Sequence, residues 1–311
     1  MVTAMKIIYS SFVILYHWLE AIVLFFTPKR LRYKDVSNDI VLITGGGSGL
    51  GRLLAVKFAR RNAKIVVWDI IESNLNETKR MIEENGGTCA AYVCDVSKRD
   101  EVYKTAERVR KEIGDVTILV NNAGIVNGKK FLDLEDEKMI KTLNVNTFAH
   151  FWTCKAFLPA MRQKRRGHIV TIASVLGLSS AVSVSDYVAS KFAAVGFHGS
   201  LSLETYFDGF PELNFTLVCP YMMNTGMFGG VKTDILPALD PEVAAENVMS
   251  AILTNQEFLI IPRLLYVTYV MHTLMPLKCF KIIFELFNGP KAMDTYVGKK
   301  EKKNLNDKKI E

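Results

Sequence analysis

Short apolar runs rich in β-branched residues alternate with longer segments of helical character through the middle of the chain. The runs that predict strands are residues 40–43, 64–68, 88–93, 116–120, 167–173, 213–218 and 258–261. A long helix is expected around residues 143–162, before the fifth of these strands. This alternation is typical of a parallel sheet that is covered by helices on both faces, with right-handed crossovers. The pattern therefore predicts an α/β fold with one doubly wound parallel sheet of about seven strands.

A further apolar segment, residues 7–27, precedes the first predicted strand. A helix of this length spans the hydrocarbon core of a bilayer at about 1.5 Å per residue. Pro28-Lys29-Arg30 follows it instead of a small-residue cleavage site, which disfavours a removed signal peptide. Basic residues after the segment outnumber those before it, so we expect the following domain in the cytosol.

Glu20 lies within this segment and leaves its arrangement open. A carboxylate is costly in the middle of a bilayer, so the segment could instead lie in one leaflet as a monotopic anchor. A buried core helix is the third alternative. The sequence predicts an N-terminal membrane-anchor helix without deciding between the spanning and the monotopic form.

The end of the chain is first apolar and then charged. Residues 264–287 are interrupted by Pro276, Lys278 and Lys281, so we expect them to pack on the core or to enter the membrane interface. The tail has the charge-rich composition of disordered segments. The expected parts are an anchor with a basic flank (residues 1–35), one sheet domain (36–261), an apolar extension (262–297) and a charged tail (298–311).

Composition narrows the class of protein. The chain has 311 residues, 49% of them hydrophobic, and a formal net charge of +7 whose excess lies beside the N-terminal apolar segment and in the tail. Because no basic stripe runs through the sheet region, this distribution favours a membrane surface over nucleic acid as partner. The five cysteines are scattered without metal-ligand spacing, so we expect reduced thiols and no metal site.

A glycine-rich turn joins the first predicted strand to a helix expected over residues 52–60. It reads Thr44-Gly45-Gly46-Gly47-Ser48-Gly49-Leu50-Gly51. Backbone N–H groups at a helix N-terminus have no intrahelical partner, and glycine lets the backbone approach a ligand closely, so the turn can hold a pyrophosphate. Alone it could serve only a tight connection, but in a parallel sheet it predicts a Rossmann-type dinucleotide site.

Polar residues also follow the next three predicted strands, at Asp69, at Asp95-Val96 and at Asn121-Asn122. Ligands of open parallel sheets bind outside these carboxyl ends. Asp69 can accept hydrogen bonds from an adenosine ribose and would repel a 2′-phosphate, and neither Ser48 nor Ile70 offers a basic side chain to offset that repulsion. These residues favour NAD without excluding NADP; a helix-capping role for Asp69 is the alternative.

Ser174, Tyr187 and Lys191 form the constellation with the most specific chemistry. Tyr187 and Lys191 lie one turn apart in a helix expected over residues 186–199, whose start Ser185 or Asp186 can cap. An ammonium beside a phenol favours the phenolate, so we expect the pKa of Tyr187 to lie below its usual value of about 10. Tyr187 can then take a proton from an alcohol or return one to a carbonyl. Ser174, at the end of the fifth predicted strand, can orient the substrate oxygen.

Over residues 40–225 these motifs resemble the short-chain dehydrogenase/reductase family. The resemblance implies catalytic roles for Ser174, Tyr187, Lys191 and Asn146, with Ser174 also contacting the substrate and Asn146 holding a water in a proton relay with Lys191. The cofactor site that it implies consists of Gly45, Ser48, Gly49, Leu50 and Gly51 at the pyrophosphate turn, Asp69 at the adenosine ribose, Asp95 and Val96 at the adenine, Asn122, Tyr187, Lys191 at the nicotinamide ribose, and Pro220 and Thr225 at the carboxamide. Tyr221 departs from the family, which usually has glycine after this proline, so the local backbone path is in doubt.

A closer resemblance covers nearly the whole chain, through the apolar N-terminus, Trp68-Asp69-Ile70, and residues 149–153, 155–159 and 225–228. These stretches resemble the membrane-anchored branch that holds epidermal retinal dehydrogenases, a membrane retinol dehydrogenase and lipid-droplet 17β-hydroxysteroid dehydrogenases. The branch implies a lipophilic alcohol such as all-trans-retinol, with a 17β-hydroxysteroid as the alternative, and the family implies a homodimer. A membrane or lipid-droplet scaffold with incidental activity is the alternative of another class.

Two further stretches bear on this interpretation. Residues 221–231 are rich in Met, Phe and Gly, which suits an apolar lid over the substrate and equally suits a part of the core. The last residues, Lys308-Lys309-Ile310-Glu311, resemble a dilysine retrieval signal. That resemblance implies an endoplasmic-reticulum membrane protein whose catalytic domain faces the cytosol, with a lipid droplet as the other location.

Overall fold

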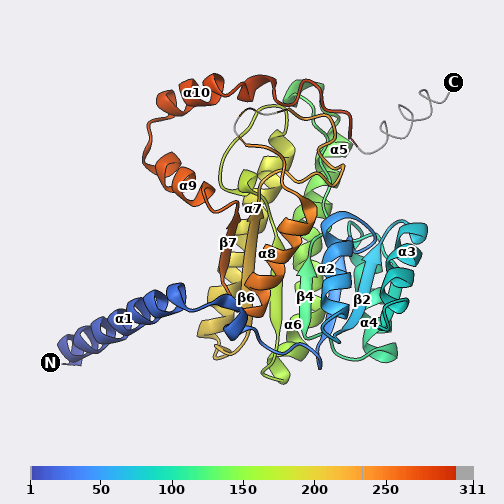
Figure 1. Ribbon diagram of the computed structural model, residues 1–311, viewed down its shortest axis with the longest axis vertical. Coiled ribbons are helices and arrows are strands. Elements are labelled where there is room, and N and C mark those ends of the chain that lie inside the picture. Colours follow the sequence, from blue (N-terminus) through green and yellow to red (C-terminus); the bar gives the residue numbers. More distant parts are fainter. Residues whose placement is uncertain (1, 233, 235, 299–311) are drawn as a thin grey trace.

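One parallel sheet organises the computed structural model, which describes residues 2–232, 234 and 236–298 (Figure 1). The strand order is β3-β2-β1-β4-β5-β6-β7, and every pairing between neighbours is parallel. The strands are β1 Ile40–Thr44, β2 Lys64–Asp69, β3 Cys89–Val93, β4 Ile118–Asn121, β5 His168–Ile172, β6 Asn214–Pro220 and β7 Phe258–Ile261. The predicted doubly wound α/β fold is confirmed. The tail from residue 299, with Lys308 and Lys309, lies outside the described residues.

Helices cover both faces of the sheet and enclose two apolar cores. One core lies under α2 Gly49–Ala59, α3 Glu72–Glu83 and α8 Pro241–Leu253, and the other lies under α4 Arg99–Glu112, α6 Ala149–Gln163 and α7 Ser185–Phe207. Both faces of the strands are therefore buried, which explains why the strands read as continuous apolar runs. The strand order reverses between β1 and β4, so a ligand crevice is expected at the carboxyl ends of these strands.

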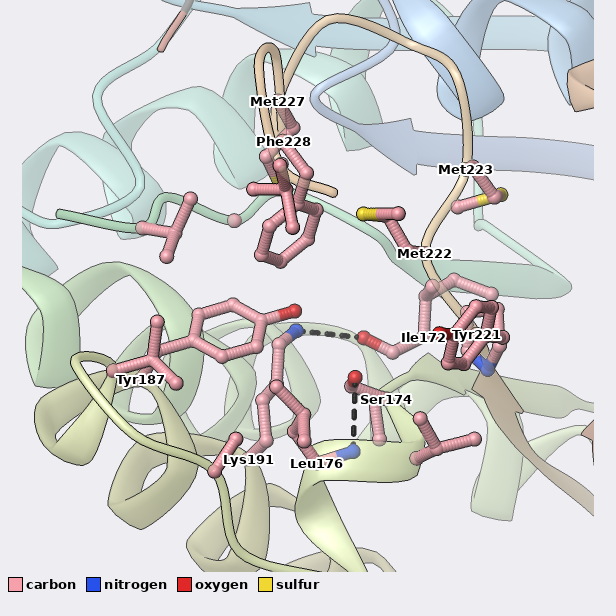
Figure 2. A pocket seen from close by; sticks show the side chains of 18 of the residues that line it. Ile172, Ser174, Leu176, Tyr187, Lys191, Tyr221, Met222, Met223, Met227 and Phe228 are labelled. Atoms are coloured by element: carbon pink, nitrogen blue, oxygen red, sulfur yellow. Dashed lines mark hydrogen bonds between the residues drawn. The ribbon is translucent and has the colours of Figure 1, made fainter. Parts of the chain in front are cut away.

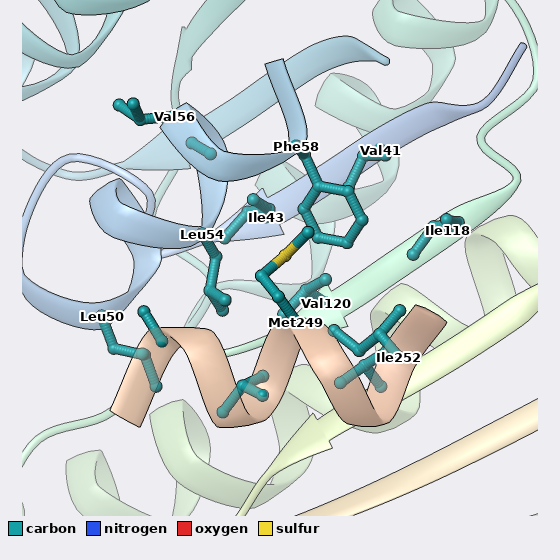
Figure 3. Packing of buried hydrophobic residues seen from close by; sticks show 14 of the residues in the cluster. Val41, Ile43, Leu50, Leu54, Val56, Phe58, Ile118, Val120, Met249 and Ile252 are labelled. Carbon is teal, nitrogen blue, oxygen red and sulfur yellow. The ribbon is translucent and has the colours of Figure 1, made fainter. Parts of the chain in front are cut away.

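Close packing between α2 and α8 supports the helix that follows the glycine-rich turn (Figure 3). Phe58 and Leu54 of α2 are fully buried, and Met249 and Ile252 of α8 face them above the central strands. Each such side chain contributes about 1.5–3 kcal/mol when it leaves water. The turn that precedes α2 is thus carried on a rigid base.

The helix between β4 and β5 differs from the prediction. A single helix was expected around residues 143–162, but the chain forms α5 Asp136–Leu143, a π-helical turn at Asn144–Phe148 and then α6. A π-helical turn is wider than an α-helical turn and is often found at functional sites. Asn146 lies within it and is fully buried.

The N-terminal helix α1, Val2–Phe26, projects away from the sheet (Figure 1). Its segment Ala4–Phe26 is 23 residues long, apolar enough to cross a membrane, and has none of its most apolar stretch buried against the rest of the protein. The chain after it is tied down: Lys29 Nζ donates to Gln256 Oε1, and Lys34 Nζ donates to Asn255 Oδ1. These bonds join the linker to the turn that follows α8.

The apolar C-terminal segment forms two short helices in place of one long one. They are α9 Leu265–Leu274 and α10 Leu277–Leu286, separated at Met275-Pro276. The chain then returns over the sheet, where the Val297 N–H donates to the Gly229 carbonyl and the Tyr296 hydroxyl donates to the Val126 carbonyl. We call residues 289–298 the C-terminal strap.

Three histidines are buried in the sheet region: His150, His168 and His198. Burial lowers the pKa of His150 to about 3 and that of His198 to about 4, and it lowers the pKa of His168 well below the usual value. Neither ring nitrogen of His150 has a hydrogen-bond partner among the described residues. All three side chains are thus neutral in the folded protein at neutral pH.

We expect mild acid to destabilise the fold through these histidines. As the pH falls through about 6.5, the unfolded chain takes up protons that the folded chain does not, so the free energy of unfolding decreases by about 1.4 kcal/mol per pH unit for each histidine. The melting temperature of the detergent-solubilised protein, followed from neutral to mildly acidic pH, should fall accordingly. The His150→Leu variant should show a shallower decrease, and an unchanged slope would contradict a neutral buried His150.

Candidate active site

A large cavity lies at the carboxyl ends of the strands. Its volume is about 1340 Å³, above the roughly 300–1,000 Å³ of a typical single-ligand pocket, so it has room for a dinucleotide and a second molecule. The predicted site residues that line it are Gly45, Ser48, Gly49, Leu50, Asp69, Asp95, Val96, Asn122, Ser174, Tyr187, Lys191, Pro220 and Thr225. Gly51 and Asn146 lie behind its wall.

The glycine turn between β1 and α2 leaves no room for side chains. Gly45 and Gly49 have φ angles of +64° and +55°, which favour glycine. A Cβ on Gly51 would lie 2.3 Å from the Gly45 carbonyl oxygen. The turn thus brings its backbone against the cavity and points the N-terminus of α2 at it, which fits the pyrophosphate of a dinucleotide.

Side chains from β1 and β4 brace this turn. The Thr44 hydroxyl accepts from the backbone N–H groups of Asn122 and Ala123, at 3.0 and 3.1 Å. The Asn122 amide donates to the Thr44 carbonyl at 2.9 Å. Asn122 therefore holds the turn in place from the cavity wall, in addition to any contact with a ligand.

The carboxylate of Asp69 stands at the end of β2, facing the cavity. Its oxygens accept from the backbone N–H groups of Gly47, at 3.0 Å, and Ile71, at 3.1 Å. Among the described residues that line the cavity, the basic side chains are Lys138, Lys141, Lys191 and His272, which belong to α5, α7 and α9 Leu265–Leu274. The guanidinium of Arg52 lies near Asp69, but it donates to the Gly47 and Asn74 carbonyls and does not line the cavity. The cavity wall at Asp69 thus offers a fixed acceptor, which fits a ribose with free hydroxyls better than a 2′-phosphate.

Ser174, Tyr187 and Lys191 meet on one side of the cavity (Figure 2). Tyr187 and Lys191 come from consecutive turns of α7, and Lys191 Nζ lies 5.6 Å from the centre of the Tyr187 ring. Lys191 Nζ donates to the Ile172 carbonyl at 3.0 Å, and the Ser174 hydroxyl accepts from the Leu176 N–H at 3.1 Å. These bonds fix the lysine and the serine around the phenol.

Burial controls the acidity of this group, which corrects one expectation. We expected Lys191 to lower the pKa of Tyr187, but burial raises the pKa of Tyr187 to about 12, and the Ser174 hydroxyl opposes this only in part. Burial also lowers the pKa of Lys191 to about 8. In the protein alone, the loss of water around the phenol therefore decides the direction of its pKa.

Asn146 is held beside the cavity by the loop after β4 and by α7. Its side-chain amide donates to the Ile125 carbonyl and to the Ser190 hydroxyl, each at 2.9 Å, and its oxygen accepts from the Ile125 N–H at 2.8 Å. A Cβ on Gly124 would lie 3.4 Å from Asn146 Oδ1 and 3.6 Å from Lys191 Nζ. Gly124 therefore lies between the two side chains and leaves space for both.

Asp186, which with Ser185 was one of the two residues expected to cap α7, has another role. The helix begins at Ser185 without a side-chain cap, and the Asp186 carboxylate accepts from Asn127 Nδ2 at 2.7 Å and from the Thr142 hydroxyl at 2.8 Å. The three residues join α7 to α5 and to the loop after β4. Sequence reasoning missed this network because its members are far apart in the chain.

The remaining wall of the cavity is apolar. Met222, Met227 and Phe228 line it after β6, and the Phe228 ring stands edge-on to the Tyr187 ring at 5.7 Å (Figure 2). This placement agrees with the expected lid over the substrate. Tyr221 is not among the described residues with a positive φ, and its N–H donates to the Ile261 carbonyl, so its replacement of glycine leaves the backbone path regular.

Comparison with known families identifies the class of protein that carries this site. The sequence model of the family described as short chain dehydrogenase matches residues 39–235. The chain therefore belongs to the short-chain dehydrogenase family. It is an oxidoreductase of the short-chain alcohol dehydrogenase type, with a nicotinamide dinucleotide as cofactor.

The chain is also similar to individual proteins along nearly its full length. It is 47% identical to human epidermal retinol dehydrogenase 2 over 292 residues, which cover 93% of this chain and 94% of that protein. It is 41% identical to human retinol dehydrogenase 10, with 97% and 98% covered. The similarity thus extends well beyond the family region into both apolar ends.

Solved structures show the same fold with a cofactor bound. A short-chain dehydrogenase/reductase from Burkholderia phymatum in complex with NAD has a TM-score of 0.70 and 25% identity, covering 76% of this chain and 93% of that one. A metagenomic short-chain oxidoreductase in complex with NADP has a TM-score of 0.62 and 26% identity, covering 72% and 96%. NADP and NAD are the nucleotides bound in those two solved structures.

We expect the Gly51→Ala variant to lose cofactor affinity by about tenfold or more. The added Cβ would collide with the Gly45 carbonyl and displace the turn that holds the pyrophosphate. Binding of NADH, followed by its fluorescence, measures the effect. The control is Gly196→Ala on α7, where a Cβ meets nothing within 4 Å and a gain of about 0.5–1 kcal/mol in stability is expected. Equal affinity in the two variants would refute the close approach at position 51.

Proposed function

We propose that this protein is an NAD-dependent dehydrogenase that oxidises a lipophilic alcohol, with all-trans-retinol as the most strongly supported substrate. The observation that carries the proposal is the combination of an apolar cavity wall with the Ser174, Tyr187 and Lys191 group. The similarity to two human proteins named retinol dehydrogenases supports the choice of alcohol. A 17β-hydroxysteroid is the alternative substrate.

The proposed cofactor site runs along the carboxyl ends of the strands, from β3 to β6. The turn from Gly45 to Gly51, with Ser48, Gly49 and Leu50, would hold the pyrophosphate, and Asp69 would hold the adenosine ribose. Asp95 and Val96 would flank the adenine, Asn122 would contact the cofactor, and Pro220 and Thr225 would hold the carboxamide. The acceptor at Asp69 supports NAD over NADP, because the nearby guanidinium of Arg52 is directed to the Gly47 and Asn74 carbonyls and does not line the cavity.

When bound, the nicotinamide cofactor would supply the acceptor for the hydride that leaves the alcohol carbon. The chain's own residues manage the hydroxyl proton: Ser174 orients the substrate oxygen, and Tyr187 Oη takes the proton from it. With its pKa raised to about 12, the phenol is neutral and carries the proton that the reverse reaction needs, whereas for oxidation it must first lose that proton. Lys191, held by the Ile172 carbonyl, supplies the positive charge that favours this loss.

Asn146 would connect Lys191 to the protein interior, since Gly124 separates the two side chains without filling the space between them. The π-helical turn places Asn146 there. We propose it as the fourth catalytic residue, which holds a water in the proton relay.

We propose residues 36–261 as the catalytic domain, 1–35 as the membrane anchor with its basic flank, 262–297 as the apolar extension and 298–311 as the tail. The exposed apolar helix α1 supports membrane association, and Lys29 to Lys34 after it support a cytosolic catalytic domain. The endoplasmic reticulum is the proposed membrane, with a lipid droplet as the alternative. A homodimer is proposed through α6 and α7, where Leu203 and Phe207 are exposed.

The Tyr187→Phe variant should lose about a thousandfold or more in kcat and keep its affinity for NAD, because it lacks only the hydroxyl that carries the proton. Turnover by membranes that contain the variant, together with NADH binding, measures both effects. Retention of turnover would remove Tyr187 from its proposed role. Rescue of a deletion phenotype by this inactive variant would favour the scaffold interpretation.

Substrate choice is tested by offering all-trans-retinol and estradiol in parallel to membranes that contain the protein, with NAD or NADP. We expect retinaldehyde and NADH as products, because the chain is similar to proteins named retinol dehydrogenases. Turnover of estradiol alone would support the 17β-hydroxysteroid alternative with the same catalytic residues. A preference for NADP would contradict the reading of Asp69.

A further inference from the structure

The helices α9 and α10 have two apolar sides, and only one of them faces the protein. In α9, the residues Leu265, Thr268, Tyr269 and His272 line the cavity at helical spacing. In α10, the residues Phe280, Ile283, Phe284 and Phe287 do the same. No residue of these two fully described helices is buried. They form a thin wall between the cavity and the outside.

This wall also carries exposed apolar side chains. Val267, Val270, Met271 and Leu274 form a stripe along α9, and Ile282 and Leu286 continue it on α10; we call these six residues the outer apolar surface. Their exposed fractions lie between 53% and 78%. A helix that is apolar on all sides is stable only when both sides leave water. The outer apolar surface therefore requires an apolar partner.

The cavity opens through this same surface. Val267 and Met271 line the cavity and yet are 60% and 53% exposed, and Ile283 and Phe287 at the other helix are 40% and 39% exposed. Side chains with both properties mark the mouth of the cavity. Whatever covers the outer apolar surface thus also meets a ligand on its way to Tyr187.

Charge identifies the partner as a lipid bilayer. Between Leu265 and Leu274 there is no acidic or basic residue other than His272. The charges of α10 form a separate stripe, Lys278, Lys281 and Glu285, at helical spacing. Such a division is typical of helices that lie in a membrane interface, with lysines at the level of anionic headgroups. In Figure 1, α1 projects on the side of the body where α9 and α10 lie, next to the edge strand β7.

We propose that the outer apolar surface of α9 and α10 inserts into the bilayer, so that the cavity opens into the acyl-chain region and a lipophilic substrate enters without crossing water. The membrane contact is independent of the chemistry. Only the entry route rests on the proposed function, through the lipophilic nature of the substrate.

Cys279 provides a direct test, because it is the exposed one of the five cysteines and lies on the side of α10 that carries Ile282 and Leu286. The full-length protein is labelled there with an environment-sensitive fluorophore and placed in phosphatidylcholine vesicles that contain lipids with a nitroxide on the acyl chain. We expect strong quenching. The matched control is Val93→Cys in a Cys279→Ser background, since Val93 is 54% exposed on the opposite edge strand β3, and it should not be quenched.

Absence of quenching at Cys279, in protein that remains bound to the vesicles, would overturn the proposal. So would self-quenching between labelled copies without quenching by the lipid nitroxide, because a second copy would then cover the surface. Neither result depends on turnover, so the membrane contact is decided even if neither retinol nor estradiol proves to be a substrate.

The entry route is tested with Leu274→Glu, which changes a side chain that does not line the cavity. With the lipophilic alcohol supplied in vesicles, kcat/KM should fall about tenfold, whereas in detergent micelles it should stay within about twofold of the parent. The Val93→Glu variant should match the parent in both. Equal loss of activity in vesicles and micelles, or no loss in either, would overturn entry from the bilayer.

Discussion

The structure depends on the close approach between the glycine turn and the strand beside it. Gly51 lies against the Gly45 carbonyl, and Asn122 donates into the same turn, so β1, α2 and β4 are fixed at one point. The strand order reverses there, and each later strand–helix unit adds another wall around the crevice. The lack of space for a Cβ is therefore at once a condition of packing and the feature that exposes backbone N–H groups to a ligand. Stability and cofactor recognition are inseparable at this point.

Most of the fold could be predicted because the strands are buried on both faces and read as continuous apolar runs. The observed strand ends differ from the predicted ones by up to two residues, because pairing with the neighbouring strands decides where a strand ends. The π-helical turn between α5 and α6 could not be predicted. Asn146 lies in this turn and donates hydrogen bonds to Ser190 and Ile125, which are both far from it in the sequence. The division of the C-terminal segment into two helices was signalled by Pro276, but the return of the strap over the loop after β6 was not.

The residues that form the candidate site could be predicted better than their pKa values. Strand ends and helical spacing suffice to bring Ser174, Tyr187 and Lys191 together. The pKa of Tyr187 was predicted in the wrong direction, because burial is a property of the assembled cavity and cannot be read from the spacing of a lysine. The contact between Asp186 and Thr142 was missed for the same reason, as it joins helices that the sequence does not place beside each other.

The π-helical turn at Asn144–Phe148 gives the chain between α5 and α6 a fixed phase. Such a turn holds one residue more than a regular α-helical path. Deleting that residue would let the turn close into a regular α-helix while α5 and α6 keep their relative orientation, because the wider turn takes up the one extra residue. Thr142 would stay beside Asp186, but Asn146 would lose the wider turn that holds it between Ile125 and Ser190. The effect of a one-residue shortening would therefore fall on the position of Asn146 and not on the packing of the two helices, so the extra residue serves the site and not the fold.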